Sequence, residues 1–197
     1  MKLYYAPGAC SLASHIALIE AGLPFKLEKI DLKTKKTETG ANFLSVNPKG
    51  YVPALVLDDG AVLTENVAIL SYIGAKAPKL MPAEGLAHWR ALEMLAFIST
   101  EVHKSFKPIF DPSADEAARK AAQARIGSRL AFLADAMGGN PFVLGADLSV
   151  ADCYLFVMLN WALAKGGIDV PPSLRAYHER LKKRPAFAQA LKEEGLA

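Results

Sequence analysis

Residues 3–15 read LYYAPGACSLASH, and the rest of the chain is organised around this stretch. A short apolar segment runs into a Pro-Gly turn, and apolar residues then recur at helical spacing from Leu12 to Ile19. The turn therefore delivers Cys10 and Ser11 to the start of a helix. Unpaired backbone N–H groups at the positive end of a helix dipole stabilise an anion. That anion is either the thiolate of Cys10 or one brought by a ligand.

The next segments predict a small mixed sheet. Residues 25–32 alternate apolar and polar side chains, which is typical of a half-buried strand, so the chain begins strand–helix–strand and favours a parallel pair. Residues 33–40 are polar and predict a loop or a short helix. Two more strands are expected at residues 55–57 and 61–63, because the Asp-Asp-Gly between them is typical of a hairpin turn. A helix is expected over residues 65–76.

The second part of the chain predicts helices only. We expect helices at residues 88–107, 114–137, 149–163, 173–184 and 185–196. Ser149 and Asp152 form a capping-box pattern at the start of the third of these. Mixed elements followed by a run of helices indicate two domains. The sequence predicts an α/β domain at residues 1–77, a linker at 78–86 and an all-helical domain at 87–197.

The bulk composition excludes several classes of function. The 197 residues carry a net charge of +3 with acidic and basic residues well mixed, so no nucleic-acid partner is expected. No apolar run approaches the roughly 20 residues of a membrane span, and no signal-peptide pattern is found, so we expect a cytoplasmic protein without membrane contact. Histidine and cysteine spacings fit no metal site, and the glycine motifs of nucleotide binding are absent.

Cys10 is the first candidate for chemistry. It is either a small buried hydrophobic residue or a reactive thiol whose pKa the helix end lowers. The only other cysteine is Cys153, and no C-x-x-C pattern occurs, which disfavours a dithiol oxidoreductase. A single thiol can attack an electrophile, form a mixed disulfide or donate a hydrogen bond to another thiolate.

Three other sites have both a structural and a functional interpretation. Val52-Pro53 opens a strand; in the less common cis form, the backbone of Val52 could pair with an extended peptide. Glu65-Asn66 begins a helix, either as a simple cap or as a clamp for a charged ligand. His103 lies near the C-terminal end of a long helix, where the helix dipole favours a cation. The simpler interpretation is therefore a solvent-exposed histidine that stabilises the helix end.

The ordered motifs together resemble the glutathione S-transferases, specifically the bacterial beta class. The segments that carry the resemblance are YAPGACSLASH (5–15), VNPKGYVPAL (46–55), LTENVAI (63–69), TEVHKSF (100–106) and SVAD (149–152). The resemblance covers essentially the whole chain. It implies a thioredoxin-like N-terminal domain, an all-helical C-terminal domain, a homodimer, glutathione as co-substrate and small hydrophobic electrophiles as second substrates.

The resemblance also implies roles for single residues. Cys10 and His103 would be catalytic and lie next to the glutathione sulfur. Phe106 and Trp161 would line the pocket for the hydrophobic co-substrate, although a tryptophan on an apolar helix is more often part of a core.

Most of the remaining implied positions would hold the glutathione backbone and its charged ends. Val52 would pair with the tripeptide backbone next to a cis Pro53. Glu65 and Asn66 would hold the γ-glutamyl end, and Lys35 would approach the glycine carboxylate. Further implied glutathione-binding positions are Thr100, Glu101 (reaching across the dimer) and His103.

Three functions remain open on the sequence. The first is conjugation of glutathione to electrophiles, with thiol transfer as a possible second activity. The second is non-catalytic sequestration of hydrophobic compounds in the same cleft. The third is a specialised glutathione-dependent dehalogenase, isomerase or peroxidase.

Overall fold

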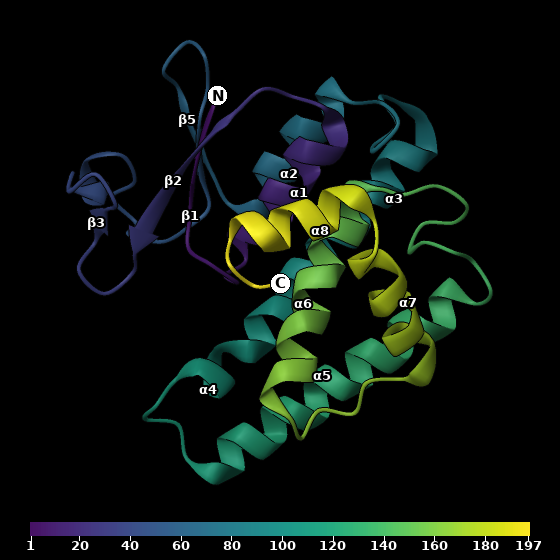
Figure 1. The fold of residues 1–197 in the computed structure, drawn as a ribbon. Helices are drawn as coiled ribbons and strands as arrows, with labels where there is room; N and C mark the ends of the chain where they lie inside the picture. Colours follow the sequence, from purple (N-terminus) through teal and green to yellow (C-terminus); the bar gives the residue numbers. More distant parts are fainter.

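A five-stranded sheet with two helices is followed by a helical part in the computed structural model, which describes residues 1–197 (Figure 1). The strands are β1 (Lys2–Tyr5), β2 (Lys26–Asp31), β3 (Lys36–Thr37), β4 (Ala54–Val56) and β5 (Val62–Thr64). The α-helices are α1 (Ser11–Ala21), α2 (Asn66–Lys76), α3 (Gly85–Phe97), α4 (Lys107–Phe110), α5 (Glu116–Met137), α6 (Val150–Lys165), α7 (Pro172–Lys182) and α8 (Pro185–Glu193). Short irregular turns are η1 (Phe43–Ser45), η2 (Ile98–Val102) and η3 (His103–Phe106).

The sheet has the order β3-β2-β1-β4-β5. Strands β1 and β2 are parallel, as the strand–helix–strand pattern predicted, and every other neighbouring pair is antiparallel. The predicted hairpin is confirmed, with each strand one residue away from its expected position. The sequence missed β3, because two residues in a polar segment carry no strand periodicity.

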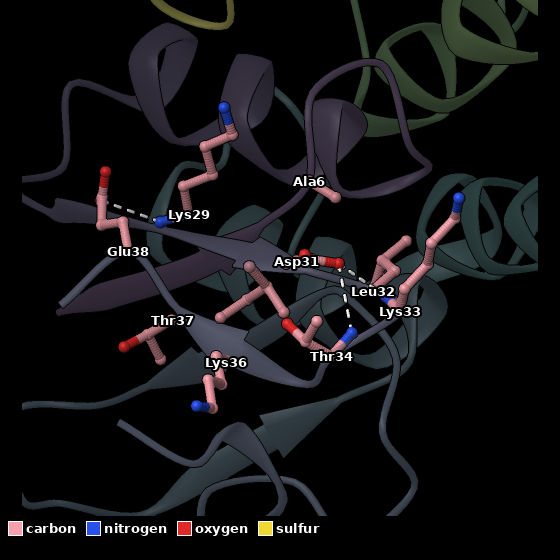
Figure 2. A pocket seen from close by; sticks show the side chains of 10 residues that line it. Ala6, Lys29, Asp31, Leu32, Lys33, Thr34, Lys36, Thr37 and Glu38 are labelled. Carbon is pink, nitrogen blue, oxygen red and sulfur yellow. Dashed lines mark hydrogen bonds between the residues drawn. The ribbon is translucent and has the colours of Figure 1, made fainter. Parts of the chain in front are cut away.

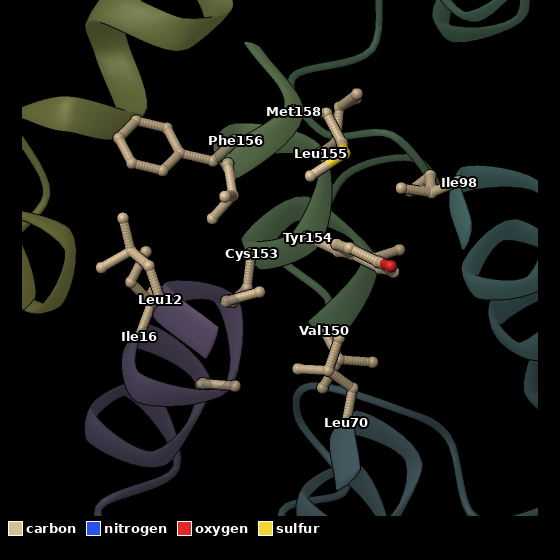
Figure 3. Packing of buried hydrophobic residues seen from close by; sticks show 14 of the residues in the cluster. Leu12, Ile16, Leu70, Ile98, Val150, Cys153, Tyr154, Leu155, Phe156 and Met158 are labelled. Atoms are coloured by element: carbon tan, nitrogen blue, oxygen red, sulfur yellow. The ribbon is translucent and has the colours of Figure 1, made fainter. Parts of the chain in front are cut away.

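Helix α6 is the centre of the hydrophobic core. Its apolar run from Val150 to Leu159 is buried on all sides, which is what a helix without a polar face requires. Leu12 from α1 and Leu70 from α2 pack around it, with Ile98 from η2 nearby (Figure 3). The sheet domain and the helices therefore share one continuous core.

The predicted cap at the start of α6 is confirmed. The backbone N–H and the hydroxyl of Ser149 donate to Oδ2 of Asp152 at 2.8 and 2.7 Å. The other carboxylate oxygen accepts from the Val143 N–H at 2.8 Å and from the Tyr177 hydroxyl at 2.6 Å. Asp152 is fully buried, so one carboxylate joins the start of α6, the preceding loop and α7.

The expected single helix over residues 88–107 is wrong. Helix α3 ends at Phe97, a π-helical turn follows in η2, and η3 is a tighter 3₁₀ turn before α4. Pro108 at the start of α4 lacks the N–H that a continuous helix would need. Such irregular turns change the direction in which side chains leave the helix. The change occurs at His103, the first residue of η3.

No helix of this fold combines the length and the apolar character that a membrane crossing requires. No three histidine, cysteine, aspartate or glutamate side chains gather in a way that could hold a metal ion.

Candidate active site

Cys10 ends the turn after β1 and forms the N-cap of α1. Its Sγ donates a hydrogen bond to the carbonyl oxygen of Val52 at 3.3 Å. The backbone N–H groups of Cys10 and Ser11 lie beside the sulfur and favour its charged form. The predicted meeting of a thiol with helix-end amides is therefore present.

The pKa of Cys10 is nevertheless raised, to about 12, and not lowered as expected. Burial of the sulfur is the main cause, since a desolvated thiolate is costly, and the nearby Glu65 carboxylate adds to it. The helix amides and the Asn66 side chain act in the opposite direction but are outweighed. Cys10 is thus a protonated thiol at neutral pH, able to donate a hydrogen bond.

The Val52-Pro53 peptide bond is cis, as the resemblance implied and against the more common isomer. Val52 is buried and stands just before β4. Its N–H makes no hydrogen bond within the chain, and its carbonyl accepts only the Cys10 thiol. A residue just before a sheet strand, with a free N–H and a carbonyl held only by a thiol, can pair with an extended peptide.

Glu65 and Asn66 stand at the start of α2. Glu65 has a φ of 71°, and its carboxylate pairs with Lys49 at 2.8 Å. The amide of Asn66 is buried, donates to the Cys10 carbonyl at 2.9 Å and accepts from the Ser14 hydroxyl at 2.9 Å. The Asn66 side chain therefore ties α2 to α1. The backbone N–H groups in the first turn of α2 and the second carboxylate oxygen of Glu65, Oε2, remain available to a ligand.

His103 is half-buried and comes from the helical part. Its Nδ1 lies 2.6 Å from the Tyr154 hydroxyl, and its ring meets the Trp161 ring edge-on at 5.1 Å. Burial lowers the pKa of His103 to about 4, and the neighbouring Lys104 adds to this effect. Trp161 in turn donates to the Gly8 carbonyl at 2.8 Å, which ties the His103 region to the Cys10 turn.

An aromatic cluster adjoins His103. Phe106 and Phe110 both contact Trp161, with ring centroids 5.3 and 4.9 Å apart. Phe110 is 45% exposed, so the cluster reaches the surface. The sequence reasoning missed Phe110, although its position four residues after Phe106 on a helical segment would have placed the two rings together.

The remaining predicted positions have partners within the chain. The Lys35 ammonium donates to the Gly50 carbonyl at 2.6 Å, and the exposed Thr100 hydroxyl donates to Ala96. The Glu101 carboxylate pairs with Arg125 at 3.0 Å and Arg129 at 2.9 Å. The Glu101 charge is therefore already balanced within its own chain.

Cavity size does not locate this site. An open pocket of about 760 Å³ lies along β2 and the loop that leads to β3, lined mainly by charged and polar side chains (Figure 2). Its lining includes Ala6 but not Cys10, Val52 or Glu65. Convergent hydrogen-bonding groups therefore define the candidate site better than volume does.

A hydrogen-bonded network of two carboxylates and a buried histidine contacts the turn between β1 and α1. The Gly8 N–H donates to the Glu194 carboxylate at 2.9 Å. The other Glu194 oxygen lies 3.0 Å from Nδ1 of the buried His15, and Glu193 lies 2.8 Å from its Nε2. The sequence indicated a structural role for His15, but nothing in it pointed to partners 178 and 179 residues away.

Comparisons with known proteins agree with this geometry. The family model described as "Glutathione S-transferase, N-terminal domain" matches residues 8–76, and the one described as "Glutathione S-transferase, C-terminal domain" matches residues 116–180. Glutathione S-transferase GstA of Escherichia coli O157:H7 is 41% identical over 200 residues, covering 100% of both chains.

Two solved structures are similar over 100% of both chains. One is a sphingomonad glutathione S-transferase in complex with glutathione, with 49% identity and a TM-score of 0.95. The other is a bacterial beta-class glutathione S-transferase of Sphingomonas chungbukensis, with 47% identity and a TM-score of 0.94. The chain belongs to the glutathione S-transferase family. The predicted thioredoxin-like domain followed by a helical domain, and the similarity to the beta class, are thereby confirmed.

Proposed function

We propose that this protein is a glutathione transferase that conjugates the glutathione thiolate to small hydrophobic electrophiles. The observation that carries the proposal is the unpaired N–H of Val52, whose carbonyl accepts only the Cys10 thiol. An extended tripeptide paired with Val52 would have its central side chain, the cysteine of glutathione, next to Cys10. Its γ-glutamyl end would meet the start of α2, where Glu65 takes the ammonium and backbone N–H groups take the carboxylate.

In this proposal the active site stabilises the thiolate of the ligand. The bound thiol releases its proton to solvent, because a neutral His103 with a pKa of about 4 is a poor base. The peptide N–H replaces the Cys10 thiol at the Val52 carbonyl, and the freed S–H and a ring N–H of His103 then donate to the sulfur. Lowering a thiol pKa by 2 units requires about 2.7 kcal/mol, which a few charge-assisted hydrogen bonds supply. The sulfur electron pair forms a bond to the electrophilic carbon, and a leaving group departs with its own pair.

The second substrate would occupy the aromatic cluster. Phe106, Phe110 and Trp161 offer ring faces and edges next to His103, and Phe110 opens to the surface. A flat apolar electrophile would stack there and lie within reach of the sulfur. Lys165 sits 5.1 Å from the centre of the Phe110 ring and would favour electrophiles that carry negative charge at their outer edge.

Replacing Cys10 separates two activities of the enzyme, conjugation of glutathione and thiol transfer. In Cys10→Ala we expect conjugation to fall by less than about fivefold, because only one hydrogen bond to the sulfur is lost. Thiol transfer through a mixed disulfide should disappear, since no nucleophilic thiol is left at the site. A panel of electrophiles and a mixed-disulfide substrate, assayed with glutathione, measures both. Cys153→Ala is the matched control, because Cys153 is fully buried in the core and should leave both activities in place.

Sequestration of hydrophobic compounds is the outcome that would replace this proposal. It would be indicated by tight binding of aromatic compounds together with negligible conjugation of every electrophile in the panel. Loss of conjugation in Cys10→Ala, in a protein that still folds, would instead mean that the Cys10 thiol does more than donate one hydrogen bond to the glutathione sulfur.

We also propose a homodimer formed through α3 and α5. Trp89 on α3 is 62% exposed and Phe132 on α5 is 53% exposed, and Phe132 packs on Phe97 at 5.2 Å. Large exposed apolar side chains mark interaction surfaces, and a twofold axis lets the same surface on two copies cover itself. In Phe132→Glu we expect the dimer to weaken by at least tenfold in analytical ultracentrifugation. Leu196→Glu, at a similarly exposed apolar position outside this face, should leave the dimer intact.

A further inference from the structure

Tyr154 joins the catalytic region to the core. It lies on α6 with 1% of its surface exposed, and its hydroxyl oxygen is 2.6 Å from Nδ1 of His103. The two rings meet edge-on, with centroids 5.8 Å apart and an interplanar angle of 84°. Tyr154 belongs to the cluster of buried residues around α6, so its ring has no freedom to turn away (Figure 3).

The direction of this hydrogen bond follows from the groups around it. Burial raises the pKa of the Tyr154 phenol well above its usual range, and the nearby Cys10 adds to this, so the phenol keeps its proton. Nδ1 of His103 is the one hydrogen-bond partner of the phenol oxygen within the chain. A buried hydroxyl needs an acceptor for its proton. The phenol proton is therefore directed to Nδ1 of His103.

A neutral imidazole carries one proton, on one of its two nitrogens. Burial lowers the pKa of His103 to about 4, so the ring is neutral at physiological pH. When Nδ1 accepts from Tyr154, the single ring proton must be on Nε2. Nε2 makes no hydrogen bond within the chain, so this N–H is available to a ligand. Trp161 holds the ring next to the turn that carries Cys10.

We propose that Tyr154 is a positioning residue, which holds His103 in the tautomer with its proton on Nε2 and so directs that N–H to the sulfur of bound glutathione. The inference rests on the proposed function, because it gives His103 the role of hydrogen-bond donor in conjugation. It adds a residue that does not touch the ligand but decides which His103 nitrogen can donate.

Tyr154→Phe tests this role in the enzyme. The ring is kept and only the hydroxyl is lost, so we expect kcat for conjugation to fall about tenfold while the KM for glutathione changes less than twofold. In a His103→Gln background the same change should cause no further loss, because the two residues act as one unit. Tyr4→Phe is the matched control: Tyr4 is a largely buried tyrosine whose hydroxyl makes no hydrogen bond in the chain, so kcat should not change.

Nitrogen-15 NMR of histidine-labelled protein without glutathione gives a readout that is independent of turnover. The wild-type spectrum should show a protonated Nε2 and an unprotonated Nδ1 for His103, and Tyr154→Phe should show a mixture of both tautomers. A protonated Nδ1 in the wild type, or an unchanged kcat in Tyr154→Phe, would overturn the proposal. If the wild type has the expected tautomer but conjugates no electrophile, the proposed function fails while the tautomer assignment stands.

Discussion

Asp152→Ala is expected to lower the free energy of unfolding by about 4 kcal/mol or more. The fully buried carboxylate accepts hydrogen bonds from Ser149, Val143 and Tyr177. Alanine leaves all of these donors inside the protein without a partner, and each unsatisfied group costs about 1–3 kcal/mol. Relaxation of the loop before α6 and entry of water recover part of this sum. Urea unfolding followed by circular dichroism measures the loss.

The neighbouring Asp147 provides the matched control. It is exposed and lies five residues earlier, so Asp147→Ala removes the same charge without opening a buried network. We expect a change within about 0.5 kcal/mol. A loss below about 1 kcal/mol in Asp152→Ala would contradict the central role of this carboxylate in joining the loop, α6 and α7.

The sequence predicted elements well where a local pattern specifies them. The alternation in β2, the hairpin turn between β4 and β5, and the Ser149 cap all depend on residues within a few positions of one another. The break in the helix at residues 98–106 was not predicted, because the apolar spacing continues through η2 and η3. Strand β3 is too short to show a period.

In the candidate site, too, features marked by a local motif could be predicted and features that depend on distant segments could not. Cys10 at the start of α1 and Glu65 at the start of α2 could be identified from their motifs. The raised pKa of Cys10 could not, because it depends on burial by segments far apart in the sequence. Tyr154 read as one more apolar residue of α6, since nothing local shows which hydroxyl will meet His103.

Glu194→Ala is expected to have the second large effect, a loss of about 3 kcal/mol in unfolding free energy together with a clear fall in kcat. The Glu194 carboxylate is fully buried between the Gly8 N–H and the imidazole of His15. Its removal leaves both groups without their hydrogen-bond partner. Gly8 has a φ of 68°, and Leu196 covers it from the same C-terminal segment, so this segment helps to define the shape of the turn that presents Cys10.

Glu193→Ala separates this role from a general effect of charge next to His15. The Glu193 carboxylate contacts the other nitrogen of His15 at 2.8 Å, but its side chain is 37% exposed and does not touch Gly8. Water can replace it, so we expect a loss below about 1 kcal/mol and an unchanged kcat. Urea unfolding measures the loss of unfolding free energy in both variants, and conjugation assays measure kcat. Equal effects of the two substitutions would mean that His15, and not the Gly8 turn, is what the C-terminal carboxylates stabilise. A fall in kcat confined to Glu194→Ala would show that the last residues of α8 and those just after it hold the active-site turn in place.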